Sequence, residues 1–134
     1  MRDHPPVSGP HAPTWSITRI YADAQGESHF AEQLVRLENW GASGMLSADH
    51  PVEQLAFRQS DANYAWDFHT APRRQYVVLL EGGVEIETSD GEKRQFGVGD
   101  VLLAEDVSGK GHRTRSLDGR PFRALFVAAP ESAQ

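Results

Sequence analysis

Residues 67–82 read Asp-Phe-His-Thr-Ala-Pro-Arg-Arg-Gln-Tyr-Val-Val-Leu-Leu-Glu-Gly. His69 precedes Gln75 by six residues, and Gly82 follows Gln75 by seven. The run from residue 75 to residue 80 is almost continuously apolar, which is typical of a buried strand. Two consecutive glycines at 82 and 83 permit a tight bend after it. The stretch therefore predicts a polar, histidine-containing segment that leads into a core strand.

The chain after this stretch alternates between short strands and turns. Residues 84–88 alternate between apolar or threonine side chains and glutamates, so one face of this strand is expected to be exposed to solvent. The Asp-Gly pair at 90–91 is a strong hairpin signal. Further strands are expected at 15–21, 29–37, 52–59, 93–96, 101–104, 112–117 and 121–128, with a loop at 39–51. The pattern predicts an all-β sandwich or barrel.

One domain is expected from 134 residues. Residues 1–14 contain four of the eight prolines and predict a flexible N-terminal arm. The β domain is expected to span residues 15–130, and residues 131–134 form a polar C-terminal tail.

The motif positions resemble the cupin superfamily. His69, Gln75 and the glycine at 82 are similar to its first motif, and the Gly-Asp turn at 99–100 with His112 is similar to its second. The resemblance covers residues 55–128 and implies a single-domain cupin jelly-roll β-barrel. It also implies a metal site built from a His-x-His pair, a Glu and a later His. Here Ala71 occupies the second histidine position, and Gln75 replaces the carboxylate.

Strand periodicity predicts which side chains face the interior of the barrel. If His69 points inward, Asp67 and Ala71 do so too, while Trp66 and Phe68 point outward. Inward positions are likewise expected for Gln75, Val77, Leu79, His112, Thr114 and Ser116, and outward ones for Arg113 and Arg115. Leu55, Phe57 and Phe126 are candidate walls of the pocket. The prediction is an apolar pocket with a few convergent polar groups, the usual form of a small-molecule site.

The resemblance implies a divalent metal, Fe, Mn, Ni, Zn or Cu, on His69, Gln75 and His112. Imidazole suits these metals, but a neutral amide is a weaker donor than a carboxylate. Asp67 could supply the missing carboxylate, or it could orient a ligating histidine from outside the metal's own ligand set.

Three functions remain open. The first is a metal-dependent enzyme of the oxygenase, isomerase, cyclase or lyase type that acts on a small organic molecule. The second is a metal-free pocket in which His69, oriented by Asp67, acts as a general acid or base. The third is a non-catalytic module that binds a small molecule.

Two further segments carry charge beside the expected pocket. The loop from Glu105 to Gly111 is longer than the cupin pattern. It is interpreted mainly as a charged surface loop with glycine turns, and the alternative is that Glu105 or Lys110 contacts a substrate or completes an acid/base set. The adjacent arginines 73 and 74 are interpreted as a solvated turn. Outward-facing Trp66 and Phe68 are expected to contribute to a homodimer contact.

Composition restricts the remaining functions. There is no cysteine, so thiolate ligands, cysteine nucleophiles and disulfides are excluded. A net charge of −6 argues against nucleic acid as a partner. No apolar run reaches the roughly 20 residues that a membrane helix needs, and no signal peptide is recognisable. A cytoplasmic protein without a membrane partner is therefore expected.

Overall fold

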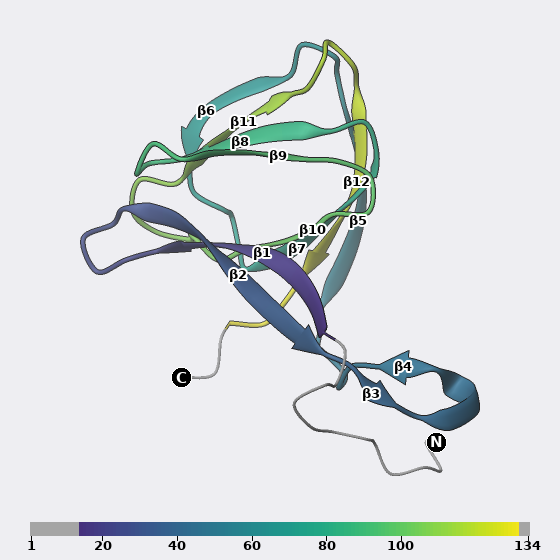
Figure 1. Ribbon diagram of the computed structural model, residues 1–134. Coiled ribbons are helices and arrows are strands. Elements are labelled where there is room, and N and C mark those ends of the chain that lie inside the picture. The colour runs from purple at the N-terminus through teal and green to yellow at the C-terminus, as the bar shows by residue number, and fades with distance from the viewer. Residues whose placement is uncertain (1–13, 132–134) are drawn as a thin grey trace.

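The computed structural model describes residues 14–131, and these residues form two facing β-sheets (Figure 1). The larger sheet has six strands in the order β2-β1-β10-β7-β12-β5. Its strands are β1 (Thr14–Ala22), β2 (Ser28–Arg36), β5 (Gln54–Ser60), β7 (Gln75–Glu81), β10 (Val101–Ala104) and β12 (Phe122–Ala128). The predicted N-terminal arm and C-terminal tail lie outside the described residues, apart from Thr14 and Glu131.

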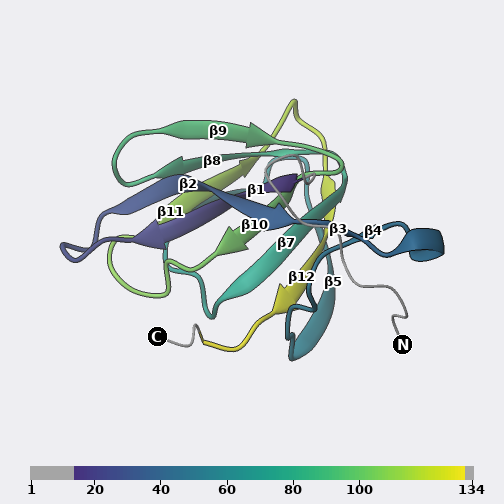
Figure 2. The same cartoon turned by 60° about the horizontal axis from the view of Figure 1, so that its bottom comes forward.

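The smaller sheet has four strands in the order β6-β11-β8-β9. They are β6 (Ala65–His69), β8 (Val84–Thr88), β9 (Lys93–Phe96) and β11 (His112–Ser116). Every ladder in this sheet is antiparallel. Figure 2 shows the two sheets from a second direction, with β8, β9 and β11 facing β7, β10 and β12.

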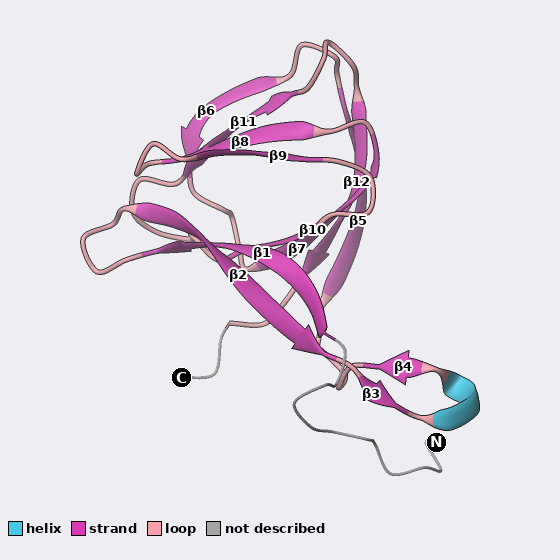
Figure 3. Ribbon diagram, viewed as in Figure 1, coloured by secondary structure: helices cyan, strands magenta, loops and turns pink. Residues whose placement is uncertain are grey.

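A small hairpin stands apart from both sheets. It consists of β3 (Glu38–Asn39), the 3-10 turn η1 (Gly41–Ser43) and β4 (Met45–Leu46). Figure 3 shows this turn as the helical segment at the tip of the hairpin. No helix among residues 14–131 is long and apolar enough to cross a membrane.

The all-β class is therefore observed, but a single closed barrel is not. Within residues 14–131 no backbone ladder joins the two sheets, because β5 pairs only with β12 and β6 pairs only with β11. The chain passes from one sheet to the other through turns, and the nitrogen of Ser116 donates to the carbonyl of Tyr64 at one such crossing (2.9 Å).

The core lies between the sheets and toward one end of them. Its buried side chains come from strands of both sheets: Ile20, Phe30, Leu79, Val84, Ile86, Phe96, Leu102, Phe122 and Ala124. This is the alternation expected of strands with one buried face, since residues 84, 86 and 88 are buried while the glutamates between them are only partly buried. Several of these core side chains also line the cavity described next.

Candidate functional site

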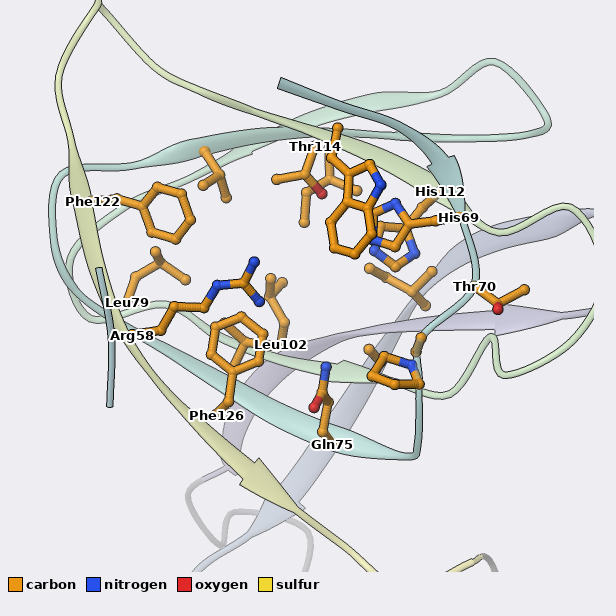
Figure 4. A pocket seen from close by; sticks show the side chains of 18 of the residues that line it. Arg58, His69, Thr70, Gln75, Leu79, Leu102, His112, Thr114, Phe122 and Phe126 are labelled. Carbon is orange, nitrogen blue, oxygen red and sulfur yellow. The ribbon is translucent and has the colours of Figure 1, made fainter. Parts of the chain in front are cut away.

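The two motif histidines meet at the end of the smaller sheet. His112 is the first residue of β11, and it pairs across the ladder with His69, the last residue of β6. Their ring centroids are 4.8 Å apart, with the ring planes inclined by 52°. Figure 4 shows both imidazoles on one wall of a cavity of about 330 Å³. The expected convergence of His69 and His112 is observed.

A buried aspartate holds the ring of His112. The Nδ1 atom of His112 lies 2.5 Å from Oδ2 of Asp106, and the Asp106 side chain is fully buried. The backbone fixes this position, because the carbonyl of Asp106 accepts a hydrogen bond from the nitrogen of Ala71 (3.0 Å). When Nδ1–H donates to a carboxylate, Nε2 of the neutral ring keeps its lone pair. His112 therefore presents a basic nitrogen to the cavity.

The second oxygen of this carboxylate has no hydrogen-bond partner among the described residues. Asp106 Oδ1 is buried and unsatisfied, which is costly for a charged group. An unsatisfied buried polar atom in a native structure calls for an explanation, and a functional role is one of them. The pairing places a buried carboxylate directly behind the histidine that lines the cavity.

The interpretation of residues 105–111 as mainly a surface loop was wrong at its first two residues. Asp106 is fully buried, and the Glu105 side chain is only 15% exposed. Both follow directly after the buried strand β10, and Asp106 precedes His112 by six residues. The acidic pair at the end of an apolar strand was the available signal. Lys110, in contrast, is exposed and pairs with Glu27.

Glu105 joins the strands behind the cavity. Its carboxylate accepts hydrogen bonds from Arg19 on β1 and from Arg74 at the start of β7. Burial opposes ionisation of Glu105, but the bonds from Arg74 and Arg19 outweigh it and hold the pKa of Glu105 below its usual value. These two arginines are therefore both engaged by the single carboxylate of Glu105.

A β-bulge changes which side chains of β6 point toward the cavity. His69 is opposite His112, but Trp66 is opposite Thr114, so three residue steps on β6 match two on β11. The extra residue breaks strict alternation. Trp66 consequently faces the cavity and stacks on His69, with centroids 3.8 Å apart and planes inclined by 10°. The expectation that Trp66 points outward was wrong.

Asp67 does not share the pocket. Its side chain is 86% exposed, and its nearest charged partner is Arg113, at 3.7 Å on the outer face. The bulge is the cause, because it turns Asp67 and Phe68 outward together. Only the backbone of Asp67 serves the site: its carbonyl accepts a hydrogen bond from Nδ1 of His69 (2.8 Å). The predicted carboxylate–imidazole pair therefore exists with different members, Asp106 and His112.

His69 is held in its neutral form. Burial lowers the pKa of His69, and the nearby ring of His112 acts in the same direction. The hydrogen bond to the carbonyl of Asp67 opposes these effects but does not cancel them. With Nδ1–H committed to this carbonyl, Nε2 of His69 also carries a lone pair.

The predicted metal ligands are only partly brought together. Gln75 lines the same cavity, and its amide lies across the cavity from the two imidazoles in Figure 4. Ala71 is buried in the wall and offers no donor. Among residues 14–131 no three side chains of the His, Cys, Asp or Glu types form a metal-holding group. The second histidine and the glutamate of the set that the resemblance implies are thus replaced by Ala71 and Gln75, and ligation by His69, Gln75 and His112 stays a prediction.

The rest of the cavity is largely apolar. Its lining includes Val77, Leu79, Leu102, Phe122 and Phe126, as strand alternation predicted for Val77, Leu79 and Phe126. Leu55 and Phe57 were expected as walls but lie on the outer surface, 55% and 83% exposed.

Arg58 was not foreseen as a pocket residue. It lies on β5 and projects into the cavity between Phe122 and Phe126 (Figure 4). The signal was present in its strand, because Arg58 has the same parity as Ser60 and Ala56, and opposite parity to exposed Leu55 and Phe57.

Comparison with solved structures gives distant likenesses. The cupin domain of Cnp3 from Schizosaccharomyces pombe is 9% identical, with 87% of this chain and 84% of that chain covered and a TM-score of 0.46. The EutQ protein of Salmonella typhimurium LT2 is 19% identical, with 90% and 99% covered and a TM-score of 0.46. A conserved protein of unknown function from Streptococcus pyogenes is 20% identical, with 64% and 72% covered and a TM-score of 0.42.

No protein-family model and no curated protein matches this chain. With TM-scores of 0.42 to 0.46, these likenesses concern the arrangement of strands alone.

Proposed function

We propose that this protein is a cupin-type enzyme, with a jelly-roll arrangement of its two sheets, that transfers a proton on a small organic molecule. His112 is the general base, and Asp106 positions its ring. The observation that carries this proposal is the buried contact between Asp106 and His112 at the wall of an apolar cavity. A base with a fixed tautomer and a lone pair aimed at a cavity is suited to proton abstraction.

The chemistry follows from the hydrogen bonds. Nε2 of His112 takes a proton from a carbon next to a carbonyl group, and the imidazolium that forms is stabilised by the carboxylate of Asp106. The electron pair of the broken C–H bond passes to the carbonyl oxygen as an enolate. The imidazolium exchanges its proton with water and then returns a proton to the substrate at a neighbouring atom. Neutral His69 lies beside this nitrogen and accepts a hydrogen bond from a substrate hydroxyl or enol. This proton transfer requires no oxidant or reductant, which is typical of an isomerase or lyase.

The proposal is tested by hydrogen exchange in deuterated water. Small carbonyl compounds and 2-oxo acids are incubated with the protein, and loss of the proton next to the carbonyl is followed by NMR. General-base catalysis contributes about 10²- to 10⁴-fold. We therefore expect His112→Gln to slow exchange by about this factor, and Asp106→Asn to slow it substantially without removing the base.

A matched control is His50→Gln, because His50 lies outside the cavity and contacts Tyr76. This variant is expected to exchange at the wild-type rate. Failure of wild-type protein to exchange any compound of the panel, or equal exchange by His112→Gln, would contradict the proposal.

A metal-dependent enzyme is the second candidate, and one observation favours it. Both imidazoles have Nδ1 engaged, by Asp106 and by the carbonyl of Asp67, and this pattern is typical of histidines that bind a metal through Nε2. The test is elemental analysis of tag-free protein beside the double variant His69→Ala/His112→Ala. Stoichiometric metal that is lost in the double variant would favour this candidate. Equal trace metal in both, even after reconstitution with Fe, Mn, Ni, Zn or Cu, would favour proton transfer without metal.

A further inference from the structure

The guanidinium of Arg58 projects into the cavity, and no carboxylate among residues 14–131 pairs with it. Its polar contact is the hydroxyl of Tyr64, 3.5 Å from one terminal nitrogen. Its other close contacts are aromatic faces: the guanidinium carbon lies 4.9 Å from the ring centroid of Phe126 and 5.8 Å from that of Tyr64. These contacts hold the side chain in place but leave most of its five N–H donors unpaired.

The cavity lining supplies no negative charge. Its described residues include two imidazoles, one guanidinium, an amide and hydroxyl groups, but no Asp or Glu side chain. The other arginines near the cavity differ, because Arg19 and Arg74 are both paired with Glu105. An unpaired guanidinium in a mostly apolar cavity strongly favours the binding of an anion there.

Different walls of the cavity carry different polar groups. In Figure 4 the guanidinium of Arg58 and the two imidazoles lie on different walls, and the ring of Phe126 lies against the guanidinium. A bound molecule would thus place an anionic group at Arg58 and a second part near His112. Aromatic side chains on several sides, among them Trp66, Phe122 and Phe126, suit a flat or apolar body.

We propose that this cavity takes a small organic carboxylate, whose carboxylate group binds Arg58 and whose flat apolar body reaches toward His112. A carboxylate matches the planar fork of a guanidinium in a bidentate pair. A phosphate ester is less suitable, because its second charge would meet no further cationic side chain at this wall. The inference rests on the function proposed above for the same pocket, but it concerns binding and is measured without turnover.

The test compares ligands that differ only in charge. Benzoate and benzamide have the same shape, and their dissociation constants for the wild-type protein are measured by calorimetry. A hydrogen-bonded ion pair that replaces a neutral contact changes affinity by about tenfold or more. We expect benzoate to bind at least about tenfold more tightly than benzamide, and phenyl phosphate to bind more weakly than benzoate.

Variants assign this preference to Arg58. Arg58→Gln is expected to remove the preference for benzoate, and Arg58→Lys to retain part of it. Arg123→Gln is the matched control, because Arg123 lies on neighbouring β12, is exposed, and bonds Gln59 outside the cavity. It is expected to bind both ligands as the wild type does.

The outcomes separate this inference from the catalytic proposal. His112→Gln is expected to keep the preference for benzoate while losing proton exchange. The inference is overturned if benzamide binds wild type as tightly as benzoate, if Arg58→Gln keeps the preference, or if benzoate does not bind. It is also overturned if phenyl phosphate binds more tightly than benzoate. The first and last comparisons use wild-type protein only, so they hold even if an Arg58 variant fails to fold.

Discussion

At the scale of single residues, we expect Trp66 to help keep His69 uncharged. The indole covers one face of the imidazole at 3.8 Å, and His112 lies near the ring at 4.8 Å. Burial is the largest cause of the lowered pKa of His69. Because the indole supplies part of this burial, its removal should let water solvate the protonated ring.

Replacing Trp66 with Ala is expected to raise the pKa of His69 toward its usual value of about 6.5. NMR titration of the His69 ring protons measures this directly. Trp15→Ala is the control, because Trp15 is also about half exposed but lies on β1, outside the cavity lining. A His69 titration midpoint that does not move in Trp66→Ala would show that burial by the indole is not the cause.

The lowered pKa of His69 also has a consequence for stability. In the unfolded chain His69 takes up a proton near pH about 6.5, whereas the folded chain resists protonation until a lower pH. Between these two values the unfolded state binds more protons, so this residue makes the protein less stable as pH falls. Above the pKa that His69 has in the unfolded chain, this residue has no effect on stability through its protonation.

Sequence reasoning located the histidines but not their partners. His69 and His112 could be found because their spacing from the glycine turns is a linear signal. Asp67 and Trp66 were assigned to the wrong faces because a one-residue bulge leaves no mark in the hydrophobic pattern. Asp106 was missed because burial of a carboxylate depends on a histidine six residues away and on the backbone of Ala71.

At the scale of elements, Gly111 allows β11 to approach β6. Its φ is +74°, a left-handed conformation that favours glycine, and an added Cβ would lie 2.1 Å from the carbonyl oxygen of His69. This close approach sets the start of β11 against the end of β6 and so positions His112 beside His69.

Gly111→Ala is therefore expected to destabilise the protein by about 2 kcal/mol or more, because backbone strain and a backbone clash add together. Gly119→Ala is the control: its φ is +60°, but nothing lies within 4 Å of the added Cβ. The difference between the two free energies of unfolding, from urea titrations, isolates the clash. Equal losses in both variants would mean that the contact between β11 and β6 is not tight.

Element positions were largely predictable from the sequence. Expected strands at 75–80, 84–88, 93–96 and 101–104 agree with β7 to β10 within one residue, because apolar runs and glycine turns mark them locally. The expected loop at 39–51 contains the β3–η1–β4 hairpin instead. Two-residue strands carry too few side chains for alternation to be recognised. The pairing of the strands into two separate sheets is a long-range property that local patterns do not specify.

His29 joins two hairpins through ion pairs. Its Nε2 lies 2.7 Å from Asp23 in the β1–β2 turn, and its Nδ1 lies 2.8 Å from Asp90 in the β8–β9 turn. The hydrogen bond to Asp23, and then that to Asp90, raise the pKa of His29. The folded state thus binds the proton more tightly than the unfolded state.

The sign of the pH effect follows from this raised pKa. The stabilisation by protonated His29 is fully present below the unfolded pKa of about 6.5 and is lost as pH rises through the folded pKa. His29→Gln should therefore be less stable than wild type in acid, with the difference shrinking as pH rises. Urea midpoints between about pH 5.5 and about pH 9 measure it, with His50→Gln as the control. A difference that grows with pH would contradict this assignment.

At the scale of the whole molecule, one group of exposed apolar side chains lies on β5 and β7 of the larger sheet. Phe57 is 83% exposed on β5, and Leu55 and Leu80 are 55% and 52% exposed. Phe57 and Leu80 border one outer groove with Leu125. β5 is also an edge strand within the described residues, with its outer backbone edge unpaired. The expectation of a homodimer thus stays a prediction, but its expected contact moves from Trp66 and Phe68 to this face.

We expect two copies of the chain to associate through β5, because pairing of edge strands covers both the unpaired backbone and the apolar side chains beside it. Light scattering should then give about twice the chain mass of 14.8 kDa, and Phe57→Glu should reduce it to the mass of one chain. Val98→Glu is the control, because Val98 is 69% exposed in the turn between β9 and β10, away from β5. A wild-type mass of 14.8 kDa at micromolar concentration would refute the dimer. A dimer that persists in Phe57→Glu would place the contact on another face.

Since Arg58 lies on the same strand but points to the opposite side, pairing through β5 would also hold the carboxylate-binding wall of the cavity rigid.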